Sequence, residues 1–238
     1  MPSALRSTNH LLQSLPAAEF EALRSHLEPG ELVRETVLVE AGRPLTHVYL
    51  PQSGVLSITV RLSEGKAVEM ALVGRDRVFA ASAALDDGIS LTGAVVLLPG
   101  TASVLDVADF RTAAGRSAAI RALLARHVQG LVAAAQQSAA CNASHTVEAR
   151  LSHWLLRARD LTDDKSLPLA QTIGVQRNAV SIVANTLESA GIIRYSRGLI
   201  EITDVAGLRE TSCECYQAVK LQHDRLLKAP DRRSGVDG

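Results

Sequence analysis

Four polar side chains near residue 177 have the chemistry to recognise DNA bases: Gln176, Arg177, Asn178 and Ser181. They stand at the start of a segment whose apolar residues Val180, Val183 and Leu187 recur with helical spacing. Arginine can pair with guanine through two hydrogen bonds, and asparagine with adenine. Since the apolar positions occupy the opposite side of the expected helix, we expect the four polar side chains to face base edges. For Arg177, a solvated arginine at a helix start is the simpler alternative.

Two further arginines, Arg194 and Arg197, follow on an expected hairpin. Residues 194–202 have the pattern of two short strands around a glycine-containing turn. Between residues 165 and 200 the chain carries four basic residues and one acidic residue, Glu188, although the net charge of the whole chain is zero. A local basic patch of this kind is typical of a phosphate-binding surface. We therefore expect Arg194 and Arg197 to contact phosphates.

The elements that position these side chains form a helix-turn-helix. Residues 167–173 are expected to form a short amphipathic helix, Gly174 a tight turn, and residues 176–190 the second helix. Helix, glycine-containing turn and helix in this order are the signature of the motif. A generic pair of short helices around a glycine has the same pattern, but the hairpin that follows favours a winged helix-turn-helix.

The sequence of the N-terminal half has the pattern of an antiparallel β-structure. Between Glu31 and Phe110, short β-branched runs alternate with glycines at intervals that suit turns. The expected strands are 32–39, 47–50, 54–61, 67–73, 92–98 and 103–107. Short helices are expected before them, within residues 9–27. The pattern predicts a barrel or roll.

A long helix is expected after Asp109, because Ala, Leu, Arg and Gln dominate and no proline occurs until Pro168. Its apolar and small residues recur at alternating spacings of four and three: Leu124, Val128, Leu131, Ala135 and Ser138. This spacing is typical of a helix that packs against a like partner. The alternative is that the same face packs on the protein's own barrel. A hinge is expected at 142–144, before another helix at 147–161.

The predicted fold class is α+β, with an N-terminal antiparallel β-roll, a long dimerisation helix and a C-terminal winged helix-turn-helix. The expected domains are a sensor-like roll, the dimerisation helix, a DNA-binding domain and a disordered tail: 1–114, 115–142, 143–228 and 229–238. At 238 residues the chain has room for two ordinary domains.

Several classes of protein are disfavoured by the sequence. No run approaches the roughly 18 consecutive apolar residues of a membrane span, so we expect a cytoplasmic protein without a membrane partner. An enzyme is disfavoured, and no catalytic residue is assigned, because no nucleophile elbow, phosphate loop or dinucleotide-binding glycine pattern occurs.

The three cysteines, Cys141, Cys213 and Cys215, do not form the spaced pairs of a disulfide framework, which fits a reducing compartment. Cys213 and Cys215 offer a metal site or a redox disulfide as an alternative, but they lack a second pair and the usual two-residue spacer. His145 and His153, eight residues apart, are expected to be packing or surface residues. We therefore expect no metal and no cofactor.

The stretch from Leu167 to Leu208, in particular IGVQRNAVSIVANTLESAGIIRYSRGLIEITDVAGL, resembles the winged helix-turn-helix of the Crp/Fnr superfamily of bacterial transcription regulators. The order of helical lead-in, roll similar to a cyclic-nucleotide-binding domain, long helix and DNA-binding domain matches over almost the whole chain. The resemblance implies a homodimer that binds double-stranded DNA at an inverted repeat, with RNA polymerase as a further partner. The family has arginine at the place of Arg177, but usually glutamate at Asn178 and often arginine at Ile182. These two departures imply a different operator sequence.

The nucleotide-binding members of this superfamily carry a Gly-Glu pair for the ribose hydroxyl and, about twenty residues later, an arginine for the phosphate. The corresponding residues here are those of a degenerate pocket: Gly74, Arg75, Thr92 and Gly93. Because both the glutamate and the arginine are replaced, we expect no response to cyclic AMP. Arg75 and Arg77 could bind another anion, but a solvated turn around Asp76 is favoured. Two alternatives stay open: a regulator that does respond to a cyclic nucleotide, through a pocket formed by other residues than these, and a regulator gated by another small molecule or a cyclic dinucleotide.

Overall fold

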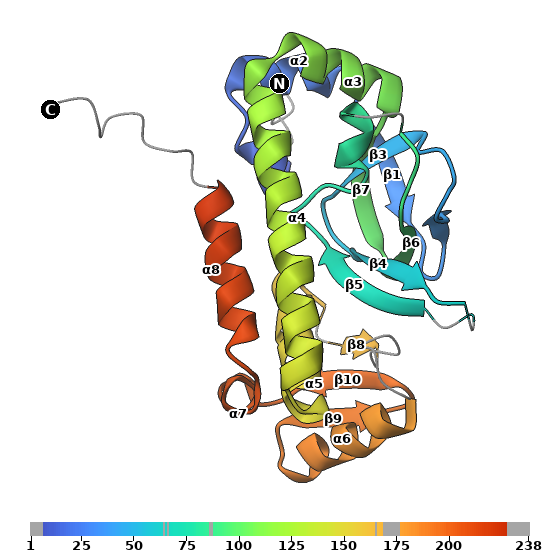
Figure 1. Ribbon diagram of the computed structural model, residues 1–238. Coiled ribbons are helices and arrows are strands. Elements are labelled where there is room, and N and C mark those ends of the chain that lie inside the picture. The colour runs from blue at the N-terminus through green and yellow to red at the C-terminus, as the bar shows by residue number, and fades with distance from the viewer. Residues whose placement is uncertain are drawn as a thin grey trace, which may run out of the picture.

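Two antiparallel sheets form a β-roll in the N-terminal half (Figure 1). The computed structural model describes residues 7–63, 65, 67–85, 88–164, 166–168 and 177–227. The first sheet has the order β1-β7-β3, with bounds Glu28–Leu32, Gly100–Asp106 and His47–Pro51. The second has the order β2-β6-β4-β5, with bounds Val37–Val39, Gly93–Leu98, Val55–Arg61 and Ala67–Val73. The expected α+β class and the antiparallel roll are confirmed.

The run expected as one strand at residues 32–39 is divided between the two sheets. β1 ends at Leu32 and pairs with β7, whereas β2 begins at Val37 and pairs with β6. Glu35 between them has a φ of 66°, a backbone conformation that few residues other than glycine adopt. The chain therefore changes sheet within this run, so the expectation of one strand is wrong.

Short helices cover one end of the roll. The expected N-terminal helices are α1, His10–Gln13, and α2, Ala17–Arg24; α3, Val107–Arg116, follows β7. A 3-10 helix, Ala81–Ala84, lies in the connection from β5 to β6. The Asn9 side chain accepts hydrogen bonds from Leu11 N and Leu12 N, which satisfies backbone donors at the start of α1.

The long helix α4 spans Ala118–Ser144 and runs along the molecule beside the roll (Figure 1). The expected single helix after Asp109 is broken at Ser117, which has an extended backbone and caps α4 by accepting a hydrogen bond from Ile120 N. Leu124 is only 1% exposed and lies in the core of the roll. At this position the alternative interpretation holds, because the side chain packs on the protein's own barrel and is not available to a partner.

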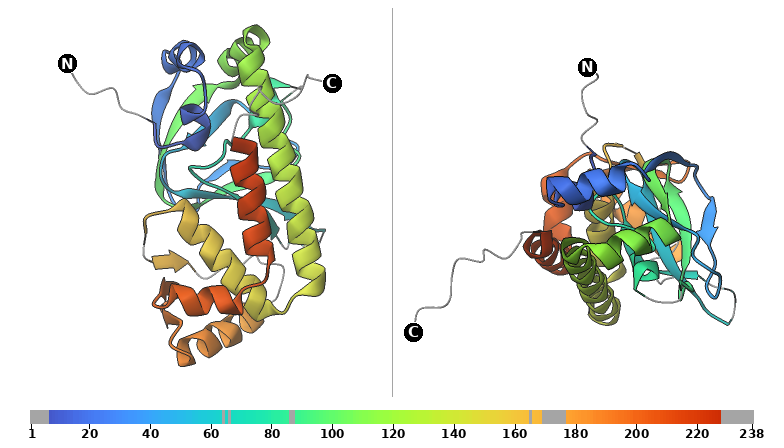
Figure 2. Two further views of the ribbon diagram at one scale, coloured as in Figure 1. Left: turned by 90° about the vertical axis from the view of Figure 1, so that its left-hand side faces the viewer. Right: turned by 90° about the horizontal axis from the view of Figure 1, so that it is seen from above.

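The C-terminal half begins with α5, Val147–Leu161, whose bounds are those expected. The turn between α4 and α5 lies at His145 and Thr146, because residues 142–144, the expected hinge, form the last turn of α4. The other described elements are α6, Arg177–Ser189, the sheet β8-β10-β9, α7 and α8, with bounds Ser166–Pro168, Leu199–Ile202, Ile193–Ser196, Val205–Thr211 and Cys215–Leu227. Figures 1 and 2 show α8 returning alongside α4. Within the described residues, no helix has the length and hydropathy that crossing a bilayer requires.

The winged domain and part of the roll share a hydrophobic core, which is separate from the core inside the roll. Val55, Leu72 and Leu98 of the roll belong to the same cluster of buried residues as Leu151 and Trp154 of α5. The Trp154 indole donates a hydrogen bond of 2.6 Å to Glu69 Oε1 on β5, so a buried polar contact also crosses this boundary. The recognition elements are therefore held against the roll by packing as well as by the α4–α5 connection.

A buried ion cluster around Asp76 joins three parts of the chain. Asp76 follows β5 in the roll; it pairs with Arg157 of α5, and its Oδ2 lies 3.4 Å from His223 Nε2 of α8. The side chains of Asp76 and Arg77 are each 5% exposed. The solvated turn expected at residues 75–77 is therefore wrong, because the winged domain and α8 cover it and Arg157 of the winged domain supplies a compensating charge.

The charges of this cluster determine its protonation. Burial alone would raise the pKa of Asp76, but Arg157, Arg77 and His223 outweigh it and hold the pKa well below its usual range. Burial lowers the pKa of Arg77 against the opposing effect of Asp76, and burial together with the charge of Arg77 lowers the pKa of His127 to about 3. Asp76 thus carries the negative charge of a cluster that brings the roll, α5 and α8 together.

We predict that Asp76→Asn lowers the free energy of unfolding by about 3–5 kcal/mol, because it leaves buried arginine charges without their partner. Because the pKa of Asp76 is lower in the folded than in the unfolded state, this stabilisation is fully present above the usual carboxyl pKa and is lost as the pH falls from there through the lowered folded-state pKa. Urea denaturation at pH 7 and at about pH 2 measures both effects. Asp163→Asn is the matched control, because Asp163 is 89% exposed and pairs with Arg75 at the surface; its effect should stay under about 1 kcal/mol. Equal effects of the two substitutions would contradict the assignment.

Candidate DNA-binding surface

Helix α6 buries one face and exposes the other. Val180, Ala184 and Leu187 are 0% exposed and pack in the shared core. Val183, expected to be buried, is half-buried. Asn178 is exposed, as expected, and Ser181 is half-buried. The helix begins at Arg177, whose side chain lies outside the described part of the structure, as does Gln176.

Two residues that the sequence analysis did not assign to the surface extend this exposed face. Ile182 is 66% exposed, and Asn185 is also exposed. Positions 178, 182 and 185 are separated by four and three residues, so they lie on one side of the helix. The spacing was available from the sequence, but the choice of face beyond the first turn depends on which side chains the core takes up.

The first helix of the expected motif is only partly within the described residues. Leu167 and Pro168 belong to strand β8, where they pair with Ile200 and Leu199 of β10. The helix expected to begin at Leu167 therefore does not begin there, because this residue is 1% exposed in a three-stranded sheet. Residues 169–173 and Gly174 lie outside the described part of the chain.

The end of α6 is fixed to the wing. Gly191 has a φ of +75°, and Ile192 N donates to Leu187 O, the arrangement that commonly ends helices at glycine. Glu188 Oε1 accepts a hydrogen bond of 2.8 Å from Tyr195 N of β9. The carboxylate of Glu188 therefore ties the helix to the hairpin.

The expected hairpin is present, and its two arginines differ. Arg197 and Gly198 have φ values of 51° and 78°, the left-handed pair of a tight two-residue turn between β9 and β10. Arg197 is exposed at this tip and, among the described residues, makes no ion pair. Arg194 Nη1 lies 3.0 Å from Glu201 Oε2 on the facing strand. The cation of Arg197 is thus fully available to an anion, and that of Arg194 is partly compensated.

The residues expected to form a degenerate nucleotide pocket do not gather at one place. Val73 pairs with Leu56, and Gly93 pairs with Thr59. Three residues along a strand correspond to about 10 Å, so Gly74, which follows Val73, lies well away from Gly93 and its neighbour Thr92. Gly74 instead packs against Leu161 of the winged domain.

The side chain of Arg75 is also committed to the winged domain. Its Nε donates to Leu161 O at 3.3 Å, and its Nη2 lies 3.0 Å from Asp163 Oδ2. The guanidinium therefore stabilises the contact between the two domains.

Comparisons with known proteins agree with this arrangement. A model of the cyclic nucleotide-binding domain matches residues 29–117, and a model of the Crp-like helix-turn-helix domain matches residues 149–211. No curated protein matches the chain.

Solved structures of regulators share the fold. FixK2 from Bradyrhizobium japonicum is 18% identical with a TM-score of 0.65, and the alignment covers 79% of this chain and 98% of FixK2. A regulator of the Crp/Fnr family from Eubacterium rectale is 14% identical with a TM-score of 0.66, covering 87% and 99% of the two chains. CLP from Xanthomonas campestris, described as a global regulator responsive to cyclic di-GMP, is 14% identical with a TM-score of 0.60, covering 79% and 99%.

The two family models match both halves of the chain in the order in which the structure places a β-roll and a winged helix. The expected family, fold and DNA-binding class are confirmed by these matches. The chain therefore belongs to the Crp/Fnr superfamily of transcription regulators, as a DNA-binding member with a cyclic-nucleotide-binding domain and a helix-turn-helix domain.

Proposed function

We propose that this regulator binds an inverted-repeat operator as a homodimer and does so without cyclic AMP. The observation that carries the DNA-binding part is the exposed face of α6, with Asn178, Ile182 and Asn185, next to the exposed Arg197 at the tip of the wing. Sequence-specific binding requires side chains that contact base edges in the major groove and cations that contact the phosphate backbone. The exposed face of α6 can supply the first, and Arg197 the second.

Each residue on this face has a matching base chemistry. Asn178 suits adenine, and Arg177, at the helix start, suits guanine. Ile182 has no hydrogen-bonding group, but its exposed side chain can contact the methyl group of thymine. We therefore propose an operator that combines these contacts and lacks the cytosine that a glutamate at position 178 would select.

The wing arginines have different roles in this proposal. Arg197 neutralises a phosphate, since its charge is unpaired within the described structure. Arg194 contributes less, because Glu201 must be displaced or shared before the guanidinium can pair with a phosphate.

We predict that Arg177→Ala costs about 1–3 kcal/mol on the preferred site and flattens the preference at one base position per half-site. Arg197→Ala should weaken binding to all sequences alike and reduce the salt slope by about one for each phosphate that is no longer neutralised. Titrations against single-base operator variants at several salt concentrations measure both. Arg194→Ala is the matched control on the same hairpin, with a smaller expected decrease in affinity. If Arg197→Ala changed the base preference while Arg177→Ala did not, the roles would have to be exchanged.

The dimerisation proposal rests on the exposed face of α4. Small and apolar or amide residues recur there at alternating spacings of four and three: Ala118, Ala122, Ala125, Gln129, Val132, Gln136, Ala139 and Ala143. The dimer contact expected from the sequence comprises residues 124, 128, 131, 135 and 138. The exposed stripe instead uses the residue that follows each of these. Of the expected residues, Leu124 lies in the roll core, while Val128, Leu131 and Ala135 are half-buried at the edge of the stripe. A 3,4 spacing suits packing against the same helix of a second copy.

We predict that Val132→Asp, at a side chain that is 51% exposed, converts a dimer into a monomer without unfolding it. A charge at the centre of the stripe would have to be buried in the dimer, whereas it stays solvated in the monomer. Sedimentation should change from about twice the chain mass of 25.3 kDa to the chain mass itself. Thr112→Asp, on the exposed side of α3, is the control and should remain dimeric. An unmodified protein that sediments as a monomer at micromolar concentration would refute the proposal.

Independence from cyclic AMP is supported by the chemistry of the roll. The residues that the resemblance assigns to the sugar and the phosphate, Arg75 and Thr92, have the wrong side chains for those contacts, and they do not lie together in the roll. The guanidinium of Arg75 instead donates a hydrogen bond to Leu161 O of the winged domain.

We predict that cyclic AMP changes neither the melting temperature nor the affinity for DNA. A ligand at one hundred times its dissociation constant would stabilise the protein by about 2.7 kcal/mol, which a thermal melt detects readily. Adenosine serves as the control for unspecific effects. Cyclic di-GMP belongs in the same titration as the alternative ligand, because CLP is described as responsive to it. A rise in melting temperature with cyclic AMP that adenosine does not produce would contradict the prediction.

A further inference from the structure

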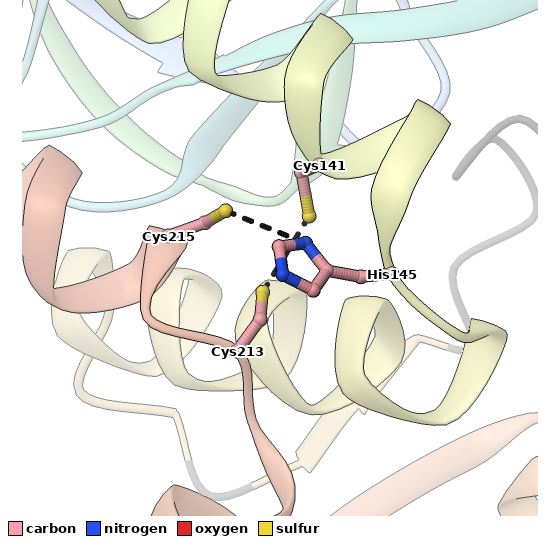
Figure 3. A group of neighbouring side chains, drawn as sticks. All are labelled: Cys141, His145, Cys213 and Cys215. Atoms are coloured by element: carbon pink, nitrogen blue, oxygen red, sulfur yellow. Dashed lines mark hydrogen bonds between the residues drawn. The ribbon is translucent and has the colours of Figure 1, made fainter.

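Four metal-ligating side chains converge between the end of α4 and the start of α8 (Figure 3). Cys141 lies in the last turn of α4, and His145 is the residue that follows the helix; its backbone N–H donates a hydrogen bond to Cys141 O, which holds the two residues together. Cys213 precedes α8, and Cys215 is its first residue. One potential ligand atom from each of the four residues lies within 4.8 Å of the other three.

The separations within the group fit one small ion. Cys141 Sγ and Cys213 Sγ are 3.5 Å apart, and Cys215 Sγ is 3.7 Å from His145 Nδ1. A tetrahedral zinc ion, with bonds of about 2.3 Å to sulfur and about 2.0 Å to nitrogen, holds its ligand atoms about 3.5–3.8 Å from one another. These two distances between ligand atoms therefore agree with those around a tetrahedral zinc ion.

Two outer contacts hold the ligands in suitable orientations. His145 Nε2 lies 3.3 Å from Glu214 Oε2, which leaves Nδ1 directed at the cysteines. Gln137 Nε2 donates a hydrogen bond of 3.0 Å to Cys215 Sγ, a contact that also favours a thiolate. A carboxylate on the second nitrogen of a ligating histidine and a donor to a ligating sulfur are the usual surroundings of zinc in proteins.

The type and number of ligands select the ion and its role. Three sulfurs and one imidazole are soft or intermediate donors, which suit zinc and exclude magnesium and calcium as partners. All three cysteines are buried, and four protein ligands complete a tetrahedron without an open position for a substrate. Closed sites of this composition are structural.

We propose that Cys141, His145, Cys213 and Cys215 bind one Zn²⁺ ion, which fastens the segment between α7 and α8 to the junction of α4 and α5. Two ligands come from the last turn of α4 and the residue after it, and two from the segment that joins α7 to α8. The ion thereby fixes the direction in which the winged domain leaves α4. No metal is expected from the sequence, because Cys213 and Cys215 lack a second cysteine pair. In this proposal Cys141 and His145 supply the other two ligands.

Metal analysis of the full-length protein tests this proposal. Protein purified from zinc-containing medium should carry one zinc per chain by plasma mass spectrometry. Protein refolded with Co²⁺ should show the intense visible bands of a tetrahedral ion together with thiolate charge-transfer absorption. This second measurement needs no substitution, so it does not depend on whether a variant folds.

Substitutions identify the ligands. Cys213→Ser and Cys215→Ser should retain less than a tenth of the zinc. The histidines provide a matched pair, because His153 Nδ1 also lies 3.8 Å from Cys141 Sγ and 3.9 Å from Cys213 Sγ. His145→Gln should lose the metal, and His153→Gln should keep it. Circular dichroism of each variant verifies that it is folded.

Several results would overturn the proposal. These are an unmodified protein with less than a tenth of a zinc per chain, a disulfide between Cys141 and Cys213 in place of metal, iron as the bound metal, and full zinc retention in Cys215→Ser. Loss of zinc from His153→Gln but not from His145→Gln would overturn the assigned ligand set. None of these measurements involves DNA, so their outcome is independent of the proposed operator binding.

Discussion

The buried carboxylate of Asp76 holds the roll, the winged domain and α8 together, and the arrangement of these three parts depends on it. A buried charge is tolerated only when opposite charges and hydrogen bonds compensate for its lost hydration. Here the compensation comes from Arg157 in the winged domain, from Arg77 beside it, and from His223 in α8. Separating the winged domain or α8 from the roll would expose or unbalance this charge. The geometry in which α6 is presented therefore depends on an interaction far from the DNA-binding surface.

The long helix α4 has three faces, which differ in what covers them. One face, with Leu124, packs on the roll. A second is covered by α8, whose first residue Cys215 accepts a hydrogen bond from Gln137. The third is the exposed stripe around Val132. The proposed second copy can therefore pack only on the side of α4 that neither the roll nor α8 covers.

Much of the fold could be predicted from local patterns. Alternating β-branched runs and glycines placed most strands of the roll to within a few residues, and the bounds of α5 were those expected. Local patterns could not decide between packing on the protein itself and packing on a partner, because Leu124 satisfies the same heptad spacing in either case. The charges at residues 75–77 have the composition of a surface turn. Their burial depends on partners that are distant in sequence, such as Arg157, which is 81 residues from Asp76. Asn178 and Arg197 are exposed, as the predicted DNA contacts require, but the contacts themselves stay a prediction. The spacing of Cys141 and His145 suggested no site in the sequence, because Cys213, which lies beside Cys141, is 72 residues away along the chain.

The chain contains one tryptophan, Trp154, and its indole lies in the boundary between the two domains. The indole nitrogen is bound to Glu69 Oε1, while Ser57 Oγ donates to the other oxygen of the same carboxylate. Indole emission depends on the polarity and hydration of its surroundings, and separation of the domains would replace a carboxylate and apolar side chains by water. The protein thus carries an intrinsic fluorophore at the joint, so that the docking of its two domains can be followed optically in the unlabelled, unmodified chain.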